Sequence, residues 1–259
     1  MDARAAAPMA LARRVACVLP GQCEICRRWG WERLCRACRE QFAVERARCT
    51  RCGLATGAAL AACGSCLQAP PPFARTIVAL DYAFPWDGII GRWKFGAHPE
   101  LASPLASLLA QAVAREFAQR TAAAPELAPS TAAAPELVLP VPLARARLAE
   151  RGFNQAWELA RRVARELGLP ARSALLARAI DTAHQAELMR AERERNLRAA
   201  FTVPPAGRQA LAGRRVALVD DVLTTGATAR ESSAALLRAG AAAVELWVLA
   251  RTPAPDARP

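Results

Sequence analysis

The sequence predicts an α/β protein in which a parallel sheet is flanked by helices and preceded by a small cysteine-rich module. Two observations predict this fold class. The stretch from Arg215 to Gly240 reads as a buried strand, two acidic residues, a tight loop and a helix, which together make one unit of a parallel sheet. Four C-x-x-C pairs lie close together near the N-terminus. With 259 residues, the chain is long enough for a main domain and a smaller module.

The cysteine-rich segment is predicted to bind metal. Each C-x-x-C pair presents two thiolates to one tetrahedral ion, so four pairs complete two four-sulfur zinc sites. Pairing of neighbours along the chain needs the shortest loops, and interleaved pairing is an open alternative. Disulfides, redox motifs and iron–sulfur ligation are the other interpretations, but no secretory signal supports disulfides and the spacing differs from iron–sulfur patterns. The expected zinc ligands are Cys23, Cys26, Cys35, Cys38, Cys49, Cys52, Cys63 and Cys66, which leaves Cys17 as a small buried apolar residue.

The role of this module is open on the sequence alone, because zinc ribbons bind nucleic acid, bind protein partners or brace a neighbouring domain. Basic and aromatic residues meet on the first knuckle, which suits stacking on bases as well as packing against the next domain. The net charge of +12 favours polyanionic ligands, although arginines also pair with glutamates on solvated helices. The knuckle residues are Arg27, Arg28, Trp29, Trp31 and Arg33.

The sequence gives no sign of a membrane protein. No run of 18 or more apolar residues appears, so no membrane span is expected. Arg13 and Arg14 stand where a signal peptide needs its hydrophobic centre. We therefore expect a cytoplasmic protein.

A proline-rich break at residues 69–72 is the expected domain boundary. We expect the N-terminal segment and ribbon module at residues 1–70 and the main domain at residues 71–259. A direct repeat, TAAAPEL-APS-TAAAPEL, predicts a mobile surface insertion at residues 121–137, because it lacks bulky side chains.

Apolar periodicity predicts the elements of the main domain. Helical spacing runs from Leu101 to Arg120 and from Ala156 to Leu167, and Pro85–Gly88 reads as a turn. The two histidines, His98 and His184, read as loop residues outside the active site. Strands are expected at Thr76–Phe84, Leu137–Val141, Leu175–Ala179, Phe201–Val203 and Val244–Ala250.

A second anion site is predicted after the strand at Leu137–Val141. The loop there leads into closely spaced arginines and then into a helix, which suits a diphosphate; the alternative is a basic helix start with its arginines in solvent. A polar segment bordered by Arg178 and Arg190 is a candidate lid over the site. The candidate residues of the diphosphate loop and lid are Leu143, Ala144, Arg145, Arg151 and Arg178.

The acidic pair and the loop after it are the main candidate site. Ligands of open α/β sheets bind beyond the carboxyl ends of the strands, and a helix N-terminus favours an anion. Asp220 and Asp221 are acceptors suited to a vicinal diol, and the hydroxyl-rich loop suits a phosphate. A phosphate at one end and a diol at the other describe a ribose 5-phosphate. The loop residues are Thr224, Thr225, Gly226, Ala227 and Thr228, where Gly226 lets the backbone approach closely.

This stretch, VALVDDVLTTGAT, resembles the signature of type I phosphoribosyltransferases. The resemblance implies that Asp220 and Asp221 contact the ribose hydroxyls of phosphoribosyl diphosphate and that Thr224 to Thr228 hold its 5-phosphate. The hypoxanthine–guanine branch carries an aspartate where this chain has Thr224, so the resemblance does not extend to that substrate class.

The chain also resembles the ComF family of competence-associated proteins, which includes the GntX-like proteins. Besides the cysteine pairs and the ligand loop, the resemblance rests on KFG at Lys94–Gly96, on RGFNQ at Arg151–Gln155, and on Gln185, Arg193, Asn196 and Phe201. It implies a type I phosphoribosyltransferase-like domain behind a double zinc ribbon. It further implies Mg²⁺ with phosphoribosyl diphosphate as ligand, and a cytoplasmic role in natural competence with single-stranded DNA and competence-machinery proteins as partners.

Three functions fit these residues. The first is a phosphoribosyltransferase with an unknown acceptor and no evident proton-transfer residue. The second is a module that senses the ligand without turning it over, while the ribbon contacts DNA or protein. The third, a DNA-binding adaptor with a vestigial pocket, is disfavoured by the intact loop. Binding and chemistry use the same residues, so the sequence does not separate the first two.

Overall fold

The computed structural model describes residues 20–96, 98–123, 134–178 and 200–254, and the chain divides into two compact units. Unit 1 ends at Val44 and unit 2 begins at Glu45. The first four paired cysteines lie in unit 1, and the other four lie in unit 2 together with the sheet. The domain boundary expected between residues 70 and 71 stays a prediction. The two compact units divide earlier in the chain, between Val44 and Glu45.

Unit 1 is small and is built around its cysteines. Two short strands pair antiparallel, Gly21 with Gly30 and Gln22 with Trp29, and a helix follows. Leu34 and the cysteines Cys23 and Cys38 are its buried apolar residues in the described part of the unit. Its elements are β1 (Gly21–Gln22), β2 (Trp29–Gly30) and α2 (Arg36–Phe42).

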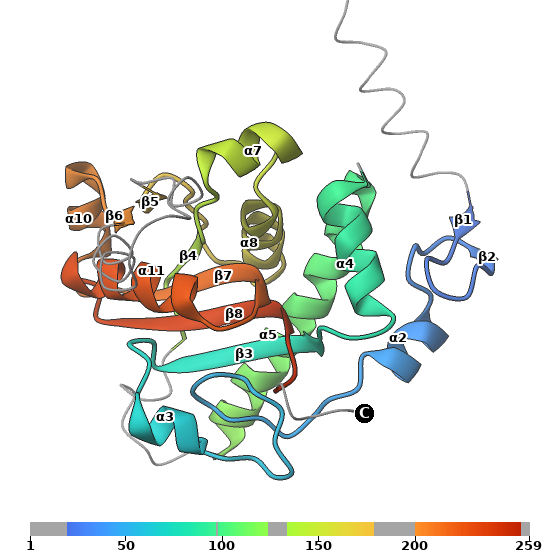
Figure 1. Ribbon diagram of the computed structural model, residues 1–259, viewed down its shortest axis with the longest axis horizontal. Coiled ribbons are helices and arrows are strands. Elements are labelled where there is room, and N and C mark those ends of the chain that lie inside the picture. The colour runs from blue at the N-terminus through green and yellow to red at the C-terminus, as the bar shows by residue number, and fades with distance from the viewer. Residues whose placement is uncertain (1–19, 97, 124–133, 179–199, 255–259) are drawn as a thin grey trace, which may run out of the picture. The chain divides into compact units, whose positions relative to one another are not determined.

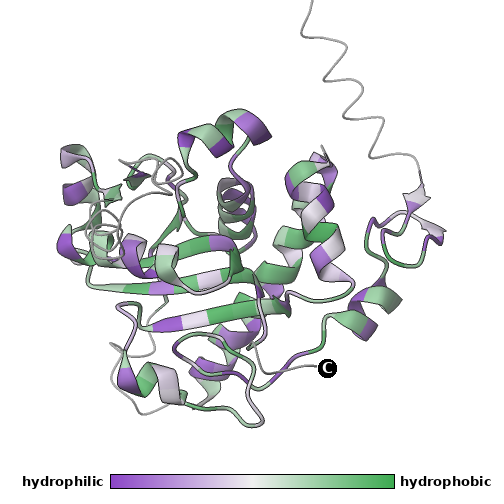
Figure 2. Ribbon diagram, viewed as in Figure 1, coloured by the Kyte–Doolittle hydropathy of each residue, from purple (hydrophilic) through white to green (hydrophobic). Residues whose placement is uncertain are grey.

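The centre of unit 2 is a four-stranded sheet in the order β3-β8-β7-β4, with all neighbours parallel (Figure 1). Figure 2 shows the strands coloured mainly as hydrophobic, because helices cover both faces of a parallel sheet. The strands are β3 (Arg75–Asp81), β4 (Leu137–Pro140), β7 (Arg215–Leu223) and β8 (Ala243–Arg251).

The helices lie on two faces of the sheet (Figure 1). One face carries α5 and α8, which contact each other as well as the strands, and the other carries α11. Leu139, Leu218, Leu246 and Leu236 belong to one buried apolar cluster that joins the sheet to its helices. These helices are α5 (Ala102–Ala123), α8 (Gln155–Glu166) and α11 (Ala227–Arg238).

The remaining elements surround the sheet. β5 and β6 form a separate antiparallel pair, Ala177 with Thr202 and Arg178 with Phe201. None of the described helices has the length and apolar character needed to cross a bilayer. The elements are α3 (Gly64–Gln68), α4 (Trp86–Phe95), the 3-10 helix η1 (Pro99–Leu101), α7 (Arg145–Arg151), β5 (Ala177–Arg178), β6 (Phe201–Thr202) and α10 (Pro205–Leu211).

The expected fold class, a parallel sheet flanked by helices with two groups of four cysteines, is confirmed. The turn expected at Pro85–Gly88 is wrong, because α4 begins at Trp86 and buries Trp86 and Ile89 on the same face. The loop expected at Pro142–Arg145 ends at Ala144, because α7 begins at Arg145 and contains the closely spaced arginines. The predicted insertion lies mostly at residues 124–133, outside the described residues.

The second group of cysteines packs on β3 through backbone contacts. The N–H of Thr76 donates to the carbonyl of Thr50 at 2.9 Å, and the hydroxyl of Thr76 donates to the carbonyl of Arg51 at 2.6 Å. Gly53 has φ +68°, and a Cβ at this position would lie 2.4 Å from Cγ2 of Val78. Only glycine therefore fits at this position of the knuckle formed by Cys49–Gly53, which touches β3.

Replacing Gly53 by alanine is expected to lower the free energy of unfolding of unit 2 by about 2–4 kcal/mol, since positive φ strain adds to overpacking. Gly213→Ala is the control: it has φ +69° with nothing within 4 Å of its added Cβ, so only the strain of about 1 kcal/mol applies. Denaturant titration followed by the fluorescence of the buried Trp93 and Trp247 measures both. Equal losses in the two variants would show that the knuckle does not pack on β3.

Candidate functional site

The two acidic residues lie inside β7, where the strand loses one of its neighbours. β4 pairs with Val216–Val219 and ends there, while β7 continues beside β8, with Asp220 opposite Val248. The sequence placed the acids after the strand, but pairing with β8 extends the strand to Leu223. The side chains of Asp220 and Asp221 therefore stand at the carboxyl edge of the sheet, the position where ligands of α/β proteins bind.

Lys94 joins this acidic pair from α4. Its Nζ lies 3.1 Å from Oδ2 of Asp221, and both side chains are largely buried, at 13% and 14% exposure. Lys94 was assigned to a family motif but not to the site. One feature of the sequence distinguishes Lys94, because it is the only lysine among the 35 lysine and arginine residues of the chain. A compact ammonium group can compensate one carboxylate charge without the bidentate geometry of a guanidinium.

The local environment raises the proton affinity of Asp220. Burial and the neighbouring carboxylate of Asp221 raise the pKa of Asp220 to about 7, although the N–H of Asp221 and the charge of Lys94 act in the opposite direction. The N–H of Asp221 donates to Oδ1 of Asp220 at 2.9 Å, and the N–H of Val222 donates to Oδ1 of Asp221 at 2.6 Å. The interaction between the two carboxylates is therefore unfavourable, and a ligand that donates hydrogen bonds to them would offset it.

The loop that follows leads directly into α11. Gly226 stands at the N-cap with φ 81° and ψ 4°, a left-handed conformation, and no side chain caps the helix. Thr224, Thr225 and Ala227 are exposed, and the N–H of Ala227 has a contact of 3.4 Å to Oγ1 of Thr225. The first turn of α11 therefore lies at the positive end of the helix dipole without a side-chain cap at Gly226, which suits phosphate binding.

The predicted diphosphate loop begins beside the acidic pair. The N–H of Val141 donates to the carbonyl of Val219 at 2.9 Å, so the chain leaves β4 next to Asp220. Leu143 is partly buried and Ala144 is buried, while Arg145 is exposed in the first turn of α7.

Arg151, at the end of α7, is linked to α4. Its guanidinium lies 4.6 Å from the ring centroid of Phe95, which is 66% exposed and follows Lys94 in the chain. Its terminal nitrogen donates to Oε1 of Gln155 at 3.2 Å. Nε of Arg151 and Nε2 of Gln155 are buried without a hydrogen-bond partner among the described residues, and Gln155 is 1% exposed. Buried donors of this kind suit an oxygen-rich ligand.

The other predicted lid residues are not brought to the acidic pair by any described contact. Arg178 lies in β5, and its guanidinium stacks over the ring of Phe201 at 5.5 Å. Arg190, His184 and Cys17 lie outside the described residues, as do Gln185, Arg193 and Asn196 of the family pattern.

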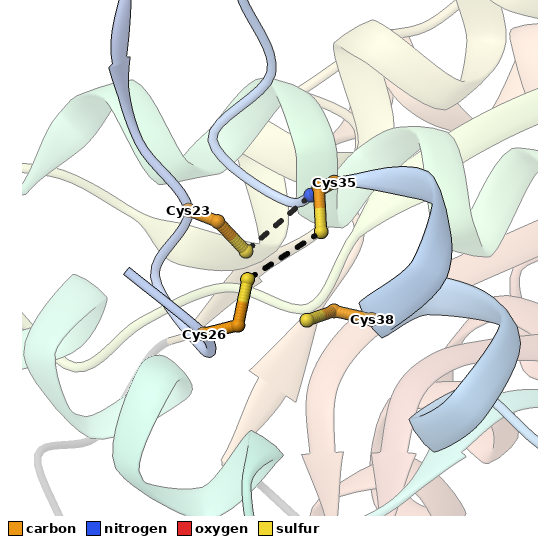
Figure 3. A group of neighbouring side chains, drawn as sticks. All are labelled: Cys23, Cys26, Cys35 and Cys38. Carbon is orange, nitrogen blue, oxygen red and sulfur yellow. Dashed lines mark hydrogen bonds between the residues drawn. The ribbon is translucent and has the colours of Figure 1, made fainter. Parts of the chain in front are cut away.

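The first cysteine tetrad consists of Cys23, Cys26, Cys35 and Cys38, whose sulfur atoms lie within 4.8 Å of one another (Figure 3). The Sγ atoms of Cys26 and Cys35 are 3.7 Å apart, and a tetrahedral ion with sulfur ligands at about 2.3 Å requires about 3.8 Å. The N–H of Cys35 points to Sγ of Cys23 at 3.4 Å. Burial raises the pKa of Cys23, but backbone N–H groups outweigh it and lower the pKa to about 6.

The second tetrad repeats this arrangement with Cys49, Cys52, Cys63 and Cys66. The Sγ atoms of Cys52 and Cys63 are 3.7 Å apart, and the N–H of Cys63 donates to Sγ of Cys49 at 3.2 Å. In each tetrad the third cysteine precedes a short helix, and the fourth is buried within that helix. The grouping confirms the sequential pairing and excludes the interleaved one, and all eight cysteines are free of disulfides.

Two curated proteins resemble this chain over most of its length. DNA utilization protein YhgH of Escherichia coli (strain K12) is 36% identical over 240 residues, which cover 90% of this chain and 98% of that protein. Competence protein F of Haemophilus influenzae is 34% identical over 218 residues, which cover 84% and 90%. No protein-family model matches the chain.

Solved structures resemble part of the chain. Glutamine phosphoribosylpyrophosphate amidotransferase from B. subtilis has a TM-score of 0.37 and 21% identity, covering 57% of this chain and 26% of its own. The HGPRT-ase from Leishmania tarentolae has a TM-score of 0.30 and 17% identity, covering 57% of this chain and 65% of its own.

Substitution of Asp220 by asparagine is expected to stabilise the free protein above pH 7. The pKa of an unfolded aspartate is about 3.9, so the folded state binds this proton more tightly than the unfolded state. The stability that comes from the protonated form is complete below about pH 4 and is lost as the pH rises through about 7. The variant should therefore gain on the order of 1–2 kcal/mol over wild type at pH 8.5 and less at pH 5.

Thermal unfolding at the two pH values measures the gain, and Glu150→Gln, which removes an exposed carboxylate on α7, is the control. A gain that is independent of pH would mean that Asp220 does not carry the raised pKa.

Proposed function

Because this chain belongs to the ComF family, together with DNA utilization protein YhgH and competence protein F, we propose that it binds phosphoribosyl diphosphate and acts in DNA uptake and processing of incoming single-stranded DNA. The names of both relatives, DNA utilization protein and competence protein, support the DNA-related part of the proposal. In this role the protein works in the cytoplasm beside the competence machinery.

The observation that carries the ligand assignment is that two kinds of binding group lie on one short stretch, at the end of β7 and the start of α11. Asp220 and Asp221 offer carboxylate oxygens to the ribose hydroxyls. A few residues on, Gly226 opens the first turn of α11 to the 5-phosphate. This ligand neutralises the stored repulsion of the carboxylates by donating hydrogen bonds to them.

The diphosphate is assigned to the edge of the sheet between β4 and α7. Leu143 and Ala144 supply the backbone of the loop, and Arg145 supplies charge at the start of α7. The unpartnered donors of Arg151 and Gln155 support an oxygen-rich group nearby. Arg178 is proposed as part of a lid. Mg²⁺ enters this site with the diphosphate, whose oxygens are the hard ligands that it prefers.

The proposed reaction is phosphoribosyl transfer. The acceptor forms a bond to the anomeric carbon of the ribose, the bond from that carbon to the diphosphate oxygen breaks, and the diphosphate leaves with the electron pair. The protein's contribution is positioning and charge stabilisation. Lys94 holds Asp221 in place for the ribose through its ion pair.

We assign one zinc ion to each cysteine tetrad. The sulfur spacing, the buried thiols and the N–H···S hydrogen bonds fit a tetrahedral structural ion. Both ribbons have few apolar residues to hold them together, so metal binding supplies their folding energy.

Phosphoribosyl diphosphate with Mg²⁺ is expected to stabilise unit 2 against heat, because it binds only the folded state. At one hundred times the dissociation constant the gain is about 2.7 kcal/mol. Gly226→Val should abolish this gain, since a β-branched side chain strains φ 81° and blocks the approach of the phosphate. The double substitution Asp220→Asn with Asp221→Asn should abolish it as well.

Gly213→Val is the matched control, because its φ of +69° carries the same strain away from the loop. Wild-type protein that does not respond to millimolar phosphoribosyl diphosphate, or a double asparagine variant that responds fully, would refute the ligand assignment. Release of diphosphate with mixed bases or single-stranded DNA then separates transfer from ligand sensing.

A second function, binding of single-stranded nucleic acid by unit 1, is favoured by one observation. Trp29 and Trp31 are 67% and 76% exposed beside Arg28, at and just after β2. Exposed aromatic rings beside basic side chains are the features on which bases stack and phosphates bind. In this alternative, the pocket of unit 2 senses its ligand while unit 1 holds the strand.

Trp29→Ala and Arg28→Ala should each weaken the binding of a single-stranded oligonucleotide. Loss of one stacked base costs about 1–3 kcal/mol, or roughly 5- to 150-fold in affinity. Arg28→Ala should also reduce the slope of affinity against salt. Fluorescence anisotropy measures both, with Arg36→Ala on α2 as the control. Unchanged affinity in both knuckle variants would remove unit 1 as the platform.

A further inference from the structure

Two arginines, Arg251 and Arg230, contact both the ligand loop and the chain segment that contains the second cysteine tetrad. Arg251 is the last residue of β8 and pairs in register with Leu223 at the end of β7. It therefore stands at the carboxyl edge of the sheet, directly below the loop that the proposed function assigns to the 5-phosphate.

The guanidinium of Arg251 joins the loop to the ribbon. Its NH1 nitrogen donates to the carbonyl of Leu223 at 2.9 Å and to that of Thr224 at 2.6 Å. Its Nε donates to the carbonyl of Cys52 at 3.3 Å. One planar guanidinium thus contacts both the first residue of the ligand loop, Thr224, and the backbone of Cys52 in the second tetrad. The single ammonium group of a lysine does not have donors fixed in two such directions.

Arg230 makes a parallel connection from α11. Its backbone N–H donates to the carbonyl of Gly226 at 2.9 Å, and this hydrogen bond belongs to the first turn of α11. Its side chain donates to the carbonyls of Ala69 at 3.0 Å and Pro70 at 3.2 Å. Ala69 is the C-cap of α3, the helix that contains Cys66. Both ends of the ligand loop are therefore tied to the second ribbon.

The second ribbon keeps its shape through its cysteines. Its buried cluster consists of Cys49, Cys63 and Cys66, with Cys52 and Ala62 partly buried against them. A cluster this small supplies little hydrophobic stabilisation, so a metal ion held by this tetrad would fix the positions of the Cys52 and Ala69 carbonyls.

We infer that the second tetrad and Arg251 position the phosphate loop, so that metal occupancy of this tetrad and binding of phosphoribosyl diphosphate are energetically coupled. The inference rests on the proposed function for the identity of the ligand, but its structural part concerns the loop alone. Arg251 and Arg230 are positioning residues, since they hold the loop backbone through its carbonyls and leave its N–H groups free for the ligand. By linkage, the ligand must then strengthen metal retention as much as the metal strengthens ligand binding.

Amide hydrogen exchange of the full chain tests the structural part without any ligand. In Cys66→Ser and in Arg251→Lys, exchange over residues 224–230 should accelerate about tenfold or more, because the loop loses its anchors. Cys38→Ser, which removes a ligand from the tetrad of unit 1, should leave this exchange at the wild-type rate. Arg238→Lys, at the other end of α11, is the control for the arginine change. Equal exchange in Cys66→Ser and Cys38→Ser, together with wild-type exchange in Arg251→Lys, overturns the inference.

Equilibrium competition for zinc between wild-type protein and a colorimetric chelator tests the coupling. Phosphoribosyl diphosphate with Mg²⁺ should raise the zinc affinity of one of the two sites by about 5- to 150-fold and leave the other unchanged. In Arg251→Lys, both sites should still bind zinc, and the ligand should no longer change the affinity of either.

The two arms separate the two proposals. A wild-type protein that is stabilised by phosphoribosyl diphosphate but binds both zinc ions with unchanged affinity overturns the coupling alone. Loop exchange that depends on Cys66 and Arg251, in a protein that never responds to phosphoribosyl diphosphate, supports the positioning role and refutes the ligand.

Discussion

The electrostatic repulsion between two adjacent carboxylates, at the point where β7 continues past the end of β4, is the constraint around which the site of unit 2 is arranged. Asp220 and Asp221 lie where β4 ends and only β8 continues beside the strand. Neighbouring carboxylates in a partly buried position are unfavourable unless other groups compensate them. Lys94 from α4, the backbone N–H groups of β7 and, in our proposal, a ribose diol provide that compensation.

This constraint explains why several distant segments meet at one edge of the sheet. Lys94 must reach Asp221, so α4 ends beside the acidic pair, and Phe95 comes into contact with Arg151 of α7. The RGFNQ segment is in turn fixed to β4, because the side chain of Asn154 donates to the carbonyl of Val141 and caps α8. Two motifs far apart in the sequence, KFG and RGFNQ, are thereby connected beside the acidic pair.

The two cysteine tetrads are alike in geometry and differ in their surroundings. Each places a backbone N–H on a sulfur and a helix after its third cysteine. The tetrad of unit 1 is accompanied by exposed tryptophans, which suit a partner outside the chain. The tetrad of unit 2 packs on β3 and is connected by Arg251 to the ligand loop. In our proposals, one small cysteine module thus serves two different roles in the same chain.

The sequence alone determined the fold class, the order of the main elements, the four C-x-x-C pairs and the acidic pair with its loop. These features are local, since hydrophobic periodicity, C-x-x-C spacing and a strand–acid–glycine–helix stretch are readable within short windows. Tertiary structure decided that Pro85–Gly88 begins a helix, because burial of Trp86 and Ile89 outweighed the local turn signal. It also decided that the acids belong to β7, because pairing with β8 extends the strand.

Long-range contacts decided the remaining parts of the site. The Lys94–Asp221 pair joins residues more than one hundred positions apart, and the hydrogen bond from Arg251 to Cys52 spans nearly two hundred. Such pairs follow from how helices and ribbons pack on the sheet, and no spacing rule within the sequence encodes them. The sequence therefore named the chemical groups of the site except Lys94, and only the tertiary structure decided which of them meet.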